Sequence, residues 1–345
     1  MATRNHRDLV VVGASAGGVE ALRDLVGELR PDLPAALLVV LHLPAGGTSA
    51  LAEILDRASR LPVSAARHGD SIVPGRVYVA PPDNHLLVHG EWSALSRGPT
   101  ENGHRPAVNA LFRSAALARG PRVVGVVLSG VLDDGAAGLI AIKTRGGLAV
   151  VQDPKDAAYA GMPESALRAV PVDHVLTAAG IGDSLNRIVR EPVGVDVIPD
   201  PPPLLRYEDA IARNQQLTPA DLDRIGRFAG LTCPDCQGSL LALEPGQDRF
   251  RCRVGHAWTA EALLATADER MQNALWIALR TLDEKAALAS RMASSARQRG
   301  SAHLSVSYER TAEETAHAAT VLRERLMRET SSSEPAASAE PAEGA

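Results

Sequence analysis

Short runs of aliphatic residues alternate with amphipathic stretches along the first half of the chain. The aliphatic runs are continuous, as in strands buried on both faces of a parallel sheet, and the stretches between them have helical spacing. This alternation predicts a doubly wound α/β domain over residues 8–190, with a mostly parallel sheet and helices on both faces. The predicted strands are 9–12, 37–41, 77–79, 123–128, 148–151 and 172–176, and the predicted helices are 17–29, 48–58, 106–118, 135–145 and 163–170.

The pattern changes after the α/β region. Prolines recur from residue 192 to residue 203, including three in a row, and favour an extended chain because proline lacks a backbone N–H and restricts φ. We therefore predict a Pro-rich linker over residues 191–217. Residues 218–229 then have helical spacing, with Thr218 as the cap and a proline at the first helical position.

Residues 260–329 are rich in Ala, Glu, Arg and Leu and carry apolar residues at helical spacing. This pattern predicts two amphipathic helices separated at Gly300. Their charged faces are typical of solvated helices, and the Ala-rich apolar stripe could pair with a receptor helix or, by self-association, with a second copy of the C-terminal helices. The final segment, 330–345, contains no large apolar side chain and is predicted to be disordered.

Composition and charge narrow the function classes. The chain has 345 residues and a formal net charge of −5, which argues against a nucleic-acid partner. Aromatic residues make up only 3% of the chain, so its core must consist mainly of Ala, Val and Leu. No apolar run approaches the roughly 20 residues that span a bilayer, and the polar first residues do not resemble a secretory signal. We therefore expect a cytoplasmic protein.

A Gly-rich turn follows the first predicted strand. Its sequence, Gly13-Ala14-Ser15-Ala16-Gly17, fits the Gly-x-Ser-x-Gly elbow, in which small neighbours permit a sharp turn that exposes a nucleophilic hydroxyl. Free N–H groups at the start of the next helix would stabilise an oxyanion there. A phosphate-binding turn stays open as the alternative, because Gly-rich turns are common in such folds. The turn lacks the Gly-Lys-Ser/Thr sequence of a P-loop, and Ser15 replaces a glycine of the dinucleotide fingerprint.

Two further residues are predicted to lie at the same edge of the sheet as Ser15. His42 ends the second predicted strand and Asp134 follows the fourth, and in open α/β sheets the reactive groups gather at the carboxyl ends of the strands. The three residues could therefore form a catalytic triad. Taken singly, His42 could be an ordinary strand-end histidine and Asp134 a helix cap, and Asp133 could take the acidic role instead.

All three cysteines lie close together in the sequence, which favours a metal site over disulfides. A closed tetrahedral set for zinc, three thiolates and one imidazole, is supplied by Cys233, Cys236, Cys252 and His256. Such a set leaves no position for substrate, so the zinc in this unit, residues 218–258, is expected to be structural. Incidental buried thiols are the alternative. Because the α/β domain has its own sheet and helices, we expect it to fold without the metal.

Several sequence blocks in the α/β region are distinctive, and they occur in a defined order. They read VGASAGG at 12–18, LHLP at 41–44, PGRVYVAPPDNH at 74–85, RPAVNALF at 105–112, LSGVLDDGAAG at 128–138 and GMP at 161–163. Together they resemble the catalytic domain of the chemotaxis protein-glutamate methylesterases, the CheB type, over about half of the chain. The resemblance implies that Ser15 is the nucleophile, His42 the general base and Asp134 the residue that orients His42.

The resemblance also implies an activity, that of a serine esterase in chemotaxis or a related chemosensory pathway. The expected reaction is hydrolysis of γ-glutamyl methyl esters on a methylated receptor through an acyl-enzyme, with release of methanol and no catalytic cofactor. In some relatives the same site deamidates glutamine. The receptor is the expected partner, and contact with a membrane would occur only through it. The alternative from another class is a non-catalytic adaptor that binds a signalling partner through the zinc unit and the helical tail.

Three features depart from the usual pattern of that family. Ala16 replaces the threonine that usually follows the nucleophile, and Val131-Leu132 replaces Met-Gly. The receiver domain that usually precedes the esterase is missing from the sequence, so we expect a receiver-less form that is not switched by phosphorylation of an attached receiver. Some receiver-less relatives carry a similar cysteine unit followed by an Ala/Leu/Arg-rich helix. Residues in the shared region that could line the substrate groove are His85, His104, Arg105 and Met162.

Overall fold

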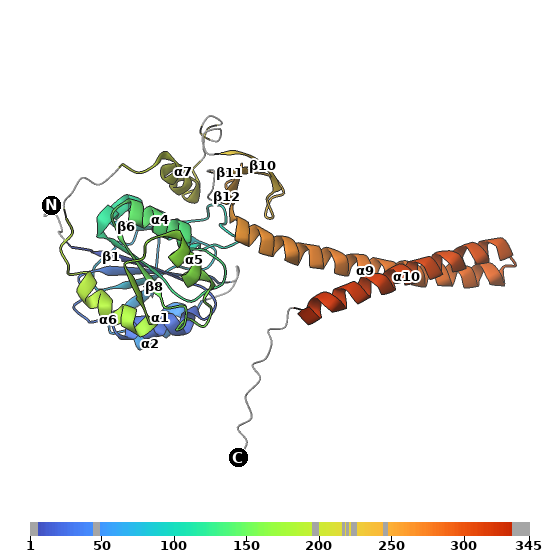
Figure 1. The fold of residues 1–345 in the computed structure, drawn as a ribbon, viewed down its shortest axis with the longest axis horizontal. Coiled ribbons are helices and arrows are strands. Elements are labelled where there is room, and N and C mark those ends of the chain that lie inside the picture. The colour runs from blue at the N-terminus through green and yellow to red at the C-terminus, as the bar shows by residue number, and fades with distance from the viewer. Residues whose placement is uncertain are drawn as a thin grey trace, which may run out of the picture. The chain divides into compact units, whose positions relative to one another are not determined.

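The structure is a computed structural model that describes residues 6–43, 49–194, 200–215, 218, 221, 226–243 and 248–332 (Figure 1). The chain divides into two compact units, of which the first ends at Leu263 and the second begins at Leu264. The domain boundaries expected near residues 190, 217 and 258 therefore all fall inside the first unit.

A parallel sheet of seven strands forms the centre of the first unit, with the order β3-β4-β2-β1-β7-β8-β9. Every residue of strands β1, β2, β4 and β7 is buried, which explains why these segments are continuous aliphatic runs in the sequence. The predicted doubly wound sheet is confirmed. Its strands are β1 (Leu9–Ala14), β2 (Ala36–Leu41), β3 (Val63–Ala65), β4 (Val77–Val79), β7 (Val123–Val127), β8 (Leu148–Gln152) and β9 (His174–Leu176).

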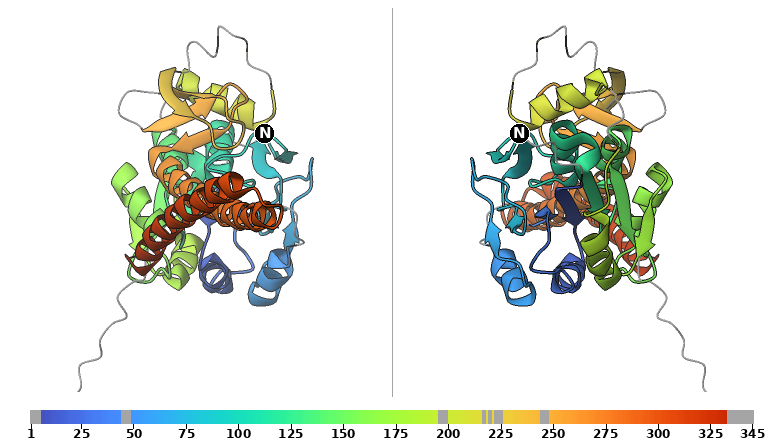
Figure 2. Two further views of the ribbon diagram at one scale, coloured as in Figure 1. Left: turned by 90° about the vertical axis from the view of Figure 1, so that its right-hand side faces the viewer. Right: turned by 90° about the vertical axis from the view of Figure 1, so that its left-hand side faces the viewer.

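Helices cover both faces of this sheet, as Figures 1 and 2 show from three directions. One buried apolar cluster joins one face of the sheet to α1, α2 and α6, and a second joins the opposite face to α3, α4 and α5. The helices are α1 (Gly18–Gly27), α2 (Leu51–Ala58), α3 (Val108–Arg119), α4 (Ala136–Thr144), α5 (Gly161–Ala169) and α6 (Ala178–Ile188). A short 3-10 turn (Gly120–Arg122) leads into β7, and β5 (His85–His89) and β6 (Trp92–Ser96) form a separate hairpin.

Helix α6 is an element that the sequence pattern did not predict. Two glycines in its first two turns lower its intrinsic helix propensity. One of them, Gly182, is required by close packing, because a Cβ there would lie 2.2 Å from the carbonyl oxygen of Leu25 in α1. Thr177 caps the helix by accepting a hydrogen bond from Gly180 N. Close packing against α1 therefore stabilises α6 despite its poor propensity.

The predicted linker over residues 191–217 contains a helix, α7 (Pro203–Ala212). Proline is compatible with the first turn of a helix, where the backbone N–H has no partner within the helix, so the proline run did not exclude one here. Leu205 joins the apolar cluster on the α3 face of the sheet, and Ala212 packs against Ala107 and Ala110. This part of the expected linker is thus packed on the α/β domain. Residues 195–199, 216 and 217 lie outside the described part of the chain.

The cysteines lie in a four-stranded antiparallel sheet, here called the ribbon, with the order β10-β11-β12-β13. Its strands are β10 (Arg227–Thr232), β11 (Ser239–Ala242), β12 (Arg249–Cys252) and β13 (Ala257–Thr259). The helix predicted over 218–229 is therefore wrong in its last three residues, because Phe228 pairs with Leu241 of β11. Thr218 does exchange hydrogen bonds with Asp221, as in a helix cap. Most of that predicted helix lies outside the described residues.

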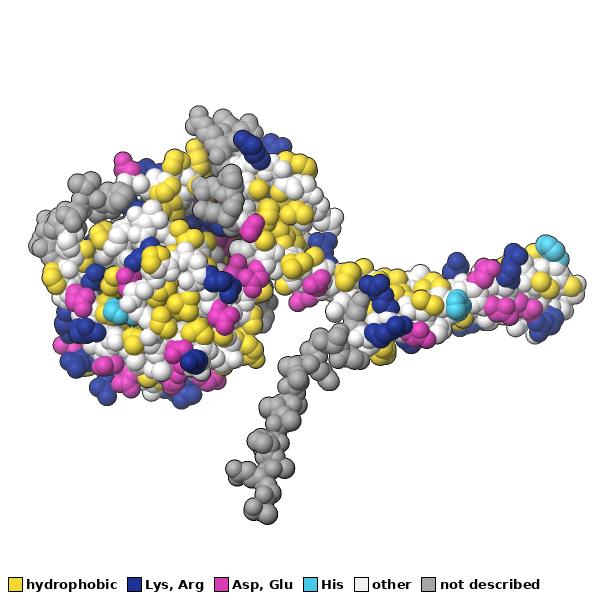
Figure 3. All heavy atoms as spheres, viewed as in Figure 1, with side chains coloured by type: hydrophobic (Ala, Val, Ile, Leu, Met, Phe, Trp, Pro, Cys, Tyr) yellow, Lys and Arg dark blue, Asp and Glu magenta, His cyan; other side chains and the backbone are white. Residues whose placement is uncertain are grey.

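Two long helices, α9 (Ala260–Gln298) and α10 (Ala302–Ser332), follow the ribbon and provide nearly all of the second unit. The turn between them contains Gly300 with φ 75°, a conformation that favours glycine, and it stands where the sequence predicted the break. Leu279, Ala319 and Leu326 form a buried cluster that joins the two helices. In Figure 3 acidic and basic side chains alternate with apolar ones along this hairpin. The predicted disordered segment lies outside the described residues from 333 onward, and α10 includes its first three residues.

Among the described residues, no helix combines the length and the hydrophobicity that crossing a membrane would require.

Candidate active site

Ser15 stands directly after strand β1, in the turn that leads into helix α1. Its backbone N–H donates to the carbonyl oxygen of Ser129 at 2.9 Å, and its side chain is half-buried. Gly17, the residue before the helix, has φ 69°, and a Cβ there would lie 2.7 Å from the Cβ of Ala158. Only a glycine at this position allows so sharp a turn. The turn thus has the elbow geometry that the Gly-x-Ser-x-Gly pattern predicted.

A second glycine allows close packing beside Ser15. A Cβ at Gly130 would lie 2.1 Å from Met162 Sδ and 2.9 Å from the Cβ of Ser15. Gly130 also accepts a hydrogen bond from Met162 N at 2.8 Å. The segment 129–135, here called the Asp134 loop, is therefore packed tightly between the serine turn and the start of helix α5.

His42 lies next to Ser15 because the register of the two parallel strands brings them side by side. Ala14 pairs with Leu41, so the following residues of the two strands, Ser15 and His42, occupy matching positions. The N–H of His42 donates to the carbonyl oxygen of Ala14 at 3.1 Å, which extends the pairing by one residue. Among the hydrogen bonds of the described residues there is none between the side chains of Ser15 and His42.

Asp134 contacts His42 directly, with 2.7 Å between Oδ2 and the ring Nε2. The carboxylate also accepts hydrogen bonds from the first amides of helix α3, Val108 N at 2.7 Å and Asn109 N at 3.0 Å. Burial by itself would raise the pKa of Asp134, but the bond to His42, its charge and these amides outweigh burial and lower the pKa to about 2. Asp134 is thus a buried anion held at a helix N-terminus.

Asp133, the alternative candidate for the acidic role, faces different groups. Its Oδ1 accepts from Thr259 Oγ1 at 2.9 Å and from Asn102 Nδ2 at 3.4 Å. Burial, opposed by the Thr259 hydrogen bond and reinforced by the charges of Asp134 and Glu261, raises the pKa of Asp133 to about 6. The geometry therefore assigns contact with His42 to Asp134, and contact with Thr259 at the end of β13 to Asp133.

His104 is a site residue that sequence reasoning left among the general groove candidates. Its ring stacks on the ring of His42, with 3.9 Å between centroids and 11° between planes. Burial, together with the charge of His42, lowers the pKa of His104 to about 4, so His104 is neutral at neutral pH. A neutral ring can support His42 without repelling a proton on it. The position of His104 one residue before a shared block was the signal in the sequence, but spacing alone cannot show a stack.

The other groove candidates have structural surroundings. His85 is fully buried on β5, where its ring bonds the carbonyl oxygen of Pro99 and the N–H of Ala107. Met162 is fully buried in the apolar cluster on the α3 face of the sheet. Arg105 forms hydrogen bonds to Asp83 Oδ1 and to the carbonyl oxygen of Gly98. The prediction that His85 and Met162 line an open groove therefore does not fit their burial, whereas Arg105 is half-buried.

The four predicted metal ligands converge at one end of the ribbon. Their ligand atoms, from Cys233, Cys236, Cys252 and His256, all lie within 4.8 Å of one another. Two sulfur atoms, Cys236 Sγ and Cys252 Sγ, are 3.6 Å apart, and Cys252 Sγ lies 3.5 Å from His256 Nδ1. Ligands at about 2.3 Å from a tetrahedral zinc ion are roughly 3.8 Å apart, which fits this spacing. The donor set and its geometry both suit zinc.

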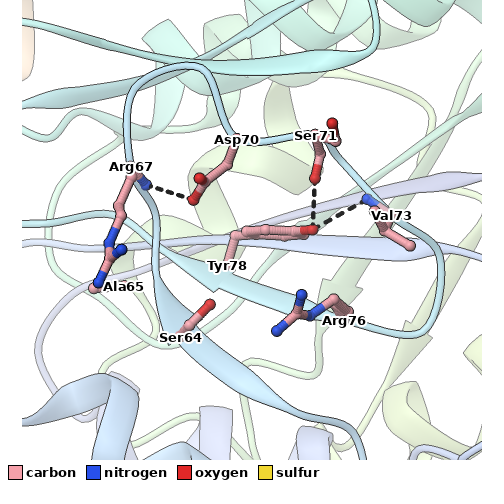
Figure 4. A pocket seen from close by; sticks show the side chains of 8 residues that line it. All are labelled: Ser64, Ala65, Arg67, Asp70, Ser71, Val73, Arg76 and Tyr78. Carbon is pink, nitrogen blue, oxygen red and sulfur yellow. Dashed lines mark hydrogen bonds between the residues drawn. The ribbon is translucent and has the colours of Figure 1, made fainter.

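One pocket of the first unit lies away from these residues. It measures about 500 Å³ and borders the edge strand β3 and its neighbour β4 (Figure 4). Tyr78 crosses it, with its hydroxyl donating to Ser71 O and accepting from Val73 N. None of Ser15, His42 and Asp134 lines this pocket, so it is separate from the candidate active site.

Comparisons with known proteins agree with this geometry. The family model for the CheB methylesterase matches residues 10–185, just over half of the chain. The chain belongs to the CheB methylesterase family. The matched region of this family member contains Ser15, His42, Asp134 and His104, whereas the ribbon and the helical hairpin lie beyond it.

Curated relatives and a solved structure fall within the same region. A protein-glutamate methylesterase/protein-glutamine glutaminase of Methanosarcina mazei is 41% identical over 192 residues, which is 53% of this chain and 52% of that protein. One of Ralstonia nicotianae is 42% identical over 50% of this chain and 46% of its own length. The CheB methylesterase catalytic domain of Thermotoga maritima is 34% identical, with a TM-score of 0.51, over 53% of this chain and 98% of that domain. The chain thus spans about half the length of the curated relatives it matches.

Proposed function

We propose that this chain is a serine esterase that hydrolyses glutamyl methyl esters on receptor proteins, in chemotaxis or a related chemosensory pathway. The observation that carries the proposal is the His42–Asp134 contact at the end of β2, in register with Ser15 at the end of β1. The relatives named protein-glutamate methylesterase/protein-glutamine glutaminase support the substrate class and suggest deamidation of glutamine as a second activity.

The residues have distinct roles in the proposed reaction. The Ser15 hydroxyl attacks the ester carbonyl carbon while His42 takes its proton. Because Asp134 engages Nε2, the other ring nitrogen, Nδ1, is the one that accepts this proton. Asp134 orients the ring and stabilises the imidazolium. The negative charge that develops on the carbonyl oxygen would be stabilised by backbone N–H groups at the start of α1, where the helix dipole favours an anion.

The second half of the reaction regenerates the serine. His42 returns the proton to the methoxy oxygen, methanol leaves, and a glutamyl ester of Ser15 remains. Water, deprotonated by His42, then attacks this acyl-enzyme. His42 gives the proton to the Ser15 oxygen as the acyl bond breaks, and the receptor glutamate leaves with its free carboxylate. No step needs a metal ion, so we propose that zinc at Cys233, Cys236, Cys252 and His256 is structural. A metal ion held by four protein ligands would stabilise the ribbon and leave no position for substrate.

The adaptor alternative is not favoured. The family match covers the catalytic domain, and the His–Asp contact that catalysis needs is present. Self-association through α9 and α10 stays a prediction, which sedimentation of the purified chain would test. We also propose that the protein acts in the cytoplasm and meets the membrane only through its receptor.

The proposed function is tested by incubating the purified chain with receptor-containing membranes that carry methyl-labelled glutamates and measuring volatile methanol. We expect release of label by the wild-type chain and none above buffer by Ser15→Ala. Ammonia release from receptors with glutamine at the methylation sites tests the deamidase activity in parallel. Absence of both products from wild-type protein over pH 6 to 9, with several receptors, would refute the proposal.

A further inference from the structure

The ribbon lies against two loops that carry the candidate active site. One is the Asp134 loop, and the other is the segment 99–105, here called the His104 loop. Both loops reach His42, one through the hydrogen bond of Asp134 and the other through the stacked ring of His104. The ribbon belongs to the same compact unit as the sheet, so its contacts with these loops are part of one folded body.

Thr259, the last residue of the ribbon, joins the two loops. Its hydroxyl donates to Asp133 Oδ1 at 2.9 Å, and its backbone N–H donates to Asn102 Oδ1 at 2.9 Å. Asn102 in turn contacts Asp133 through Nδ2. Thr259 therefore forms hydrogen bonds with Asp133, the residue before Asp134, and with Asn102, which lies two residues before His104.

Leu132 adds an apolar contact at the same place. It stands in the left-handed backbone region with φ 60°, where glycine is favoured. Its side chain packs against the buried cluster of the ribbon, which includes Trp258 and Ala262. A strained residue persists only when its surroundings hold it, and here the ribbon supplies those surroundings.

The His104 loop is bonded to the ribbon along its backbone and by buried charges. Asn102 N donates to Ala257 O at 2.8 Å, and Ala257 N donates to Thr100 O at 3.1 Å, which adds a short parallel bridge to β13. Glu101, in the middle of this bridge, is buried and pairs with Arg251 of β12 and with Arg113 of α3. Removing the ribbon would take away Arg251, one of the two buried partners of Glu101, and leave Arg113 as the other.

We propose that the ribbon is a positioning element of the esterase site: Thr259 and Leu132 hold the Asp134 loop, the bridge at Ala257 holds the His104 loop, and together they set the position of His42. The proposal rests on the proposed function only for its catalytic readout. The ribbon has few buried apolar residues, so the zinc that folds it acts on catalysis from outside the active site. The effect is partial, because Asp134 keeps its own bonds to the amides of α3.

The first test compares three variants of the full chain at saturating zinc. Thr259→Val removes the hydroxyl at nearly constant shape, Thr259→Ser keeps it, and Thr281→Val is the matched control, because the exposed Thr281 hydroxyl bonds only Ile277 O of its own helix.

Active sites are counted with a fluorophosphonate that labels Ser15. Per labelled site, we expect kcat of Thr259→Val to fall about tenfold with KM within twofold, as for loss of one hydrogen bond to a carboxylate. Thr259→Ser and Thr281→Val should keep wild-type kcat. Wild-type kcat in zinc-loaded Thr259→Val would overturn the proposal.

The second test does not depend on a variant, since Thr259 Oγ1 also accepts a hydrogen bond from Ala262 N and Val could disturb the start of α9. Zinc is removed from wild-type protein with a chelator, and the rate of Ser15 labelling is measured alongside hydrogen exchange of the sheet. We expect labelling to slow about tenfold while β1, β2 and β7 stay protected, and to recover when zinc is restored. Unchanged labelling, or loss of sheet protection, would overturn the proposal.

The two tests separate this proposal from the proposed function. If wild-type protein releases no methanol from any receptor but Ser15 labelling still depends on zinc and on Thr259, the positioning role stands and the substrate assignment fails. If methanol is released normally and neither dependence is found, the esterase stands and the positioning role fails.

Discussion

The parallel sheet and the ribbon are stabilised in different ways, although they belong to one compact unit. The sheet has two large apolar clusters, one on each face, built from aliphatic residues that are almost completely buried. The ribbon has one small cluster, and two of its five buried members are the cysteines Cys233 and Cys252. Apolar burial dominates in the sheet, whereas the ribbon has little of it, is attached by buried charges, and carries a Cys/His cluster that could hold a metal ion.

This difference separates the part of the chain that carries the candidate reactive groups from the part that contacts the loops around them. Ser15 and His42 follow the ends of β1 and β2, and the ribbon, with its small apolar cluster, contacts the loops that carry Asp134 and His104. An accessory unit of this kind can change the geometry of a site without supplying a reactive atom. If the sheet carries the chemistry and the ribbon supports it, changes in the two regions should have effects of different size.

The largest effect on catalysis is expected for Ser15→Ala. This substitution removes the proposed attacking hydroxyl and changes no residue of the ribbon. The rate of ester hydrolysis should fall about 10⁴-fold or more, as in other serine triads. Circular dichroism, zinc content and hydrogen exchange of the ribbon should match the wild type, because alanine fits the same turn. A variant that retains more than about a tenth of the wild-type rate while folded would exclude Ser15 as the nucleophile.

A smaller but still large loss is expected for Asp134→Asn. An amide cannot stabilise the imidazolium, and its NH₂ group conflicts with the α3 amides that donate to this side chain, so kcat should fall about 10³- to 10⁴-fold. Asp133→Asn is the matched control one residue away. It should cost less than about tenfold, because its amide oxygen still accepts from Thr259. Equal losses in the two variants would reverse the assignment.

Loss of the metal should unfold the ribbon while the parallel sheet stays folded. In Cys236→Ser, or after chelation, we expect amides of β11, β12 and β13 to exchange rapidly while those of β1, β2 and β7 remain protected. Trp258 is buried in the ribbon, whereas Trp92 and Trp276 are largely exposed, so tryptophan fluorescence should follow the same change. Ser294→Ala, an exposed hydroxyl change on α9, serves as a control. Purified protein without zinc, or a ribbon that stays protected without it, would contradict the structural metal.

The smallest effect concerns the pH dependence of stability at Asp133. Burial, with the charges of Asp134 and Glu261, raises its pKa to about 6, above the ordinary value of 3.8 for aspartate, so folding favours the protonated form. The native state therefore binds more protons between pH 4 and 6, and stability falls as the pH rises through that window. Asp133→Asn removes this proton uptake and should raise Tm slightly at pH 8 but not at pH 4. Melting curves at both values test this, and an equal shift at both would contradict it.

Several features could be read from the sequence because they depend on local pattern. Continuous aliphatic runs such as Leu37 to Leu41 predicted buried parallel strands, and each of the six predicted strands is present. The break at Gly300 was visible for the same reason. Other elements depended on packing: α6 has poor helix propensity and forms because Gly182 lets it approach α1, and α7 forms where the proline run suggested only a linker.

The sequence by itself determined the sheet, the serine turn and the grouping of the four zinc-type ligands, because a strand period, a Gly-x-Ser-x-Gly turn and a Cys-x-x-Cys spacing are local patterns. Only the tertiary structure shows which aspartate contacts His42, that His104 stacks on the His42 ring, and that the ribbon contacts the loops around them. These are contacts between residues far apart in the chain, and a single sequence carries no record of which distant side chains meet. The contacts of Thr259 and Leu132 with these loops belong to the same class, whereas folding of the α/β domain without the metal stays a prediction.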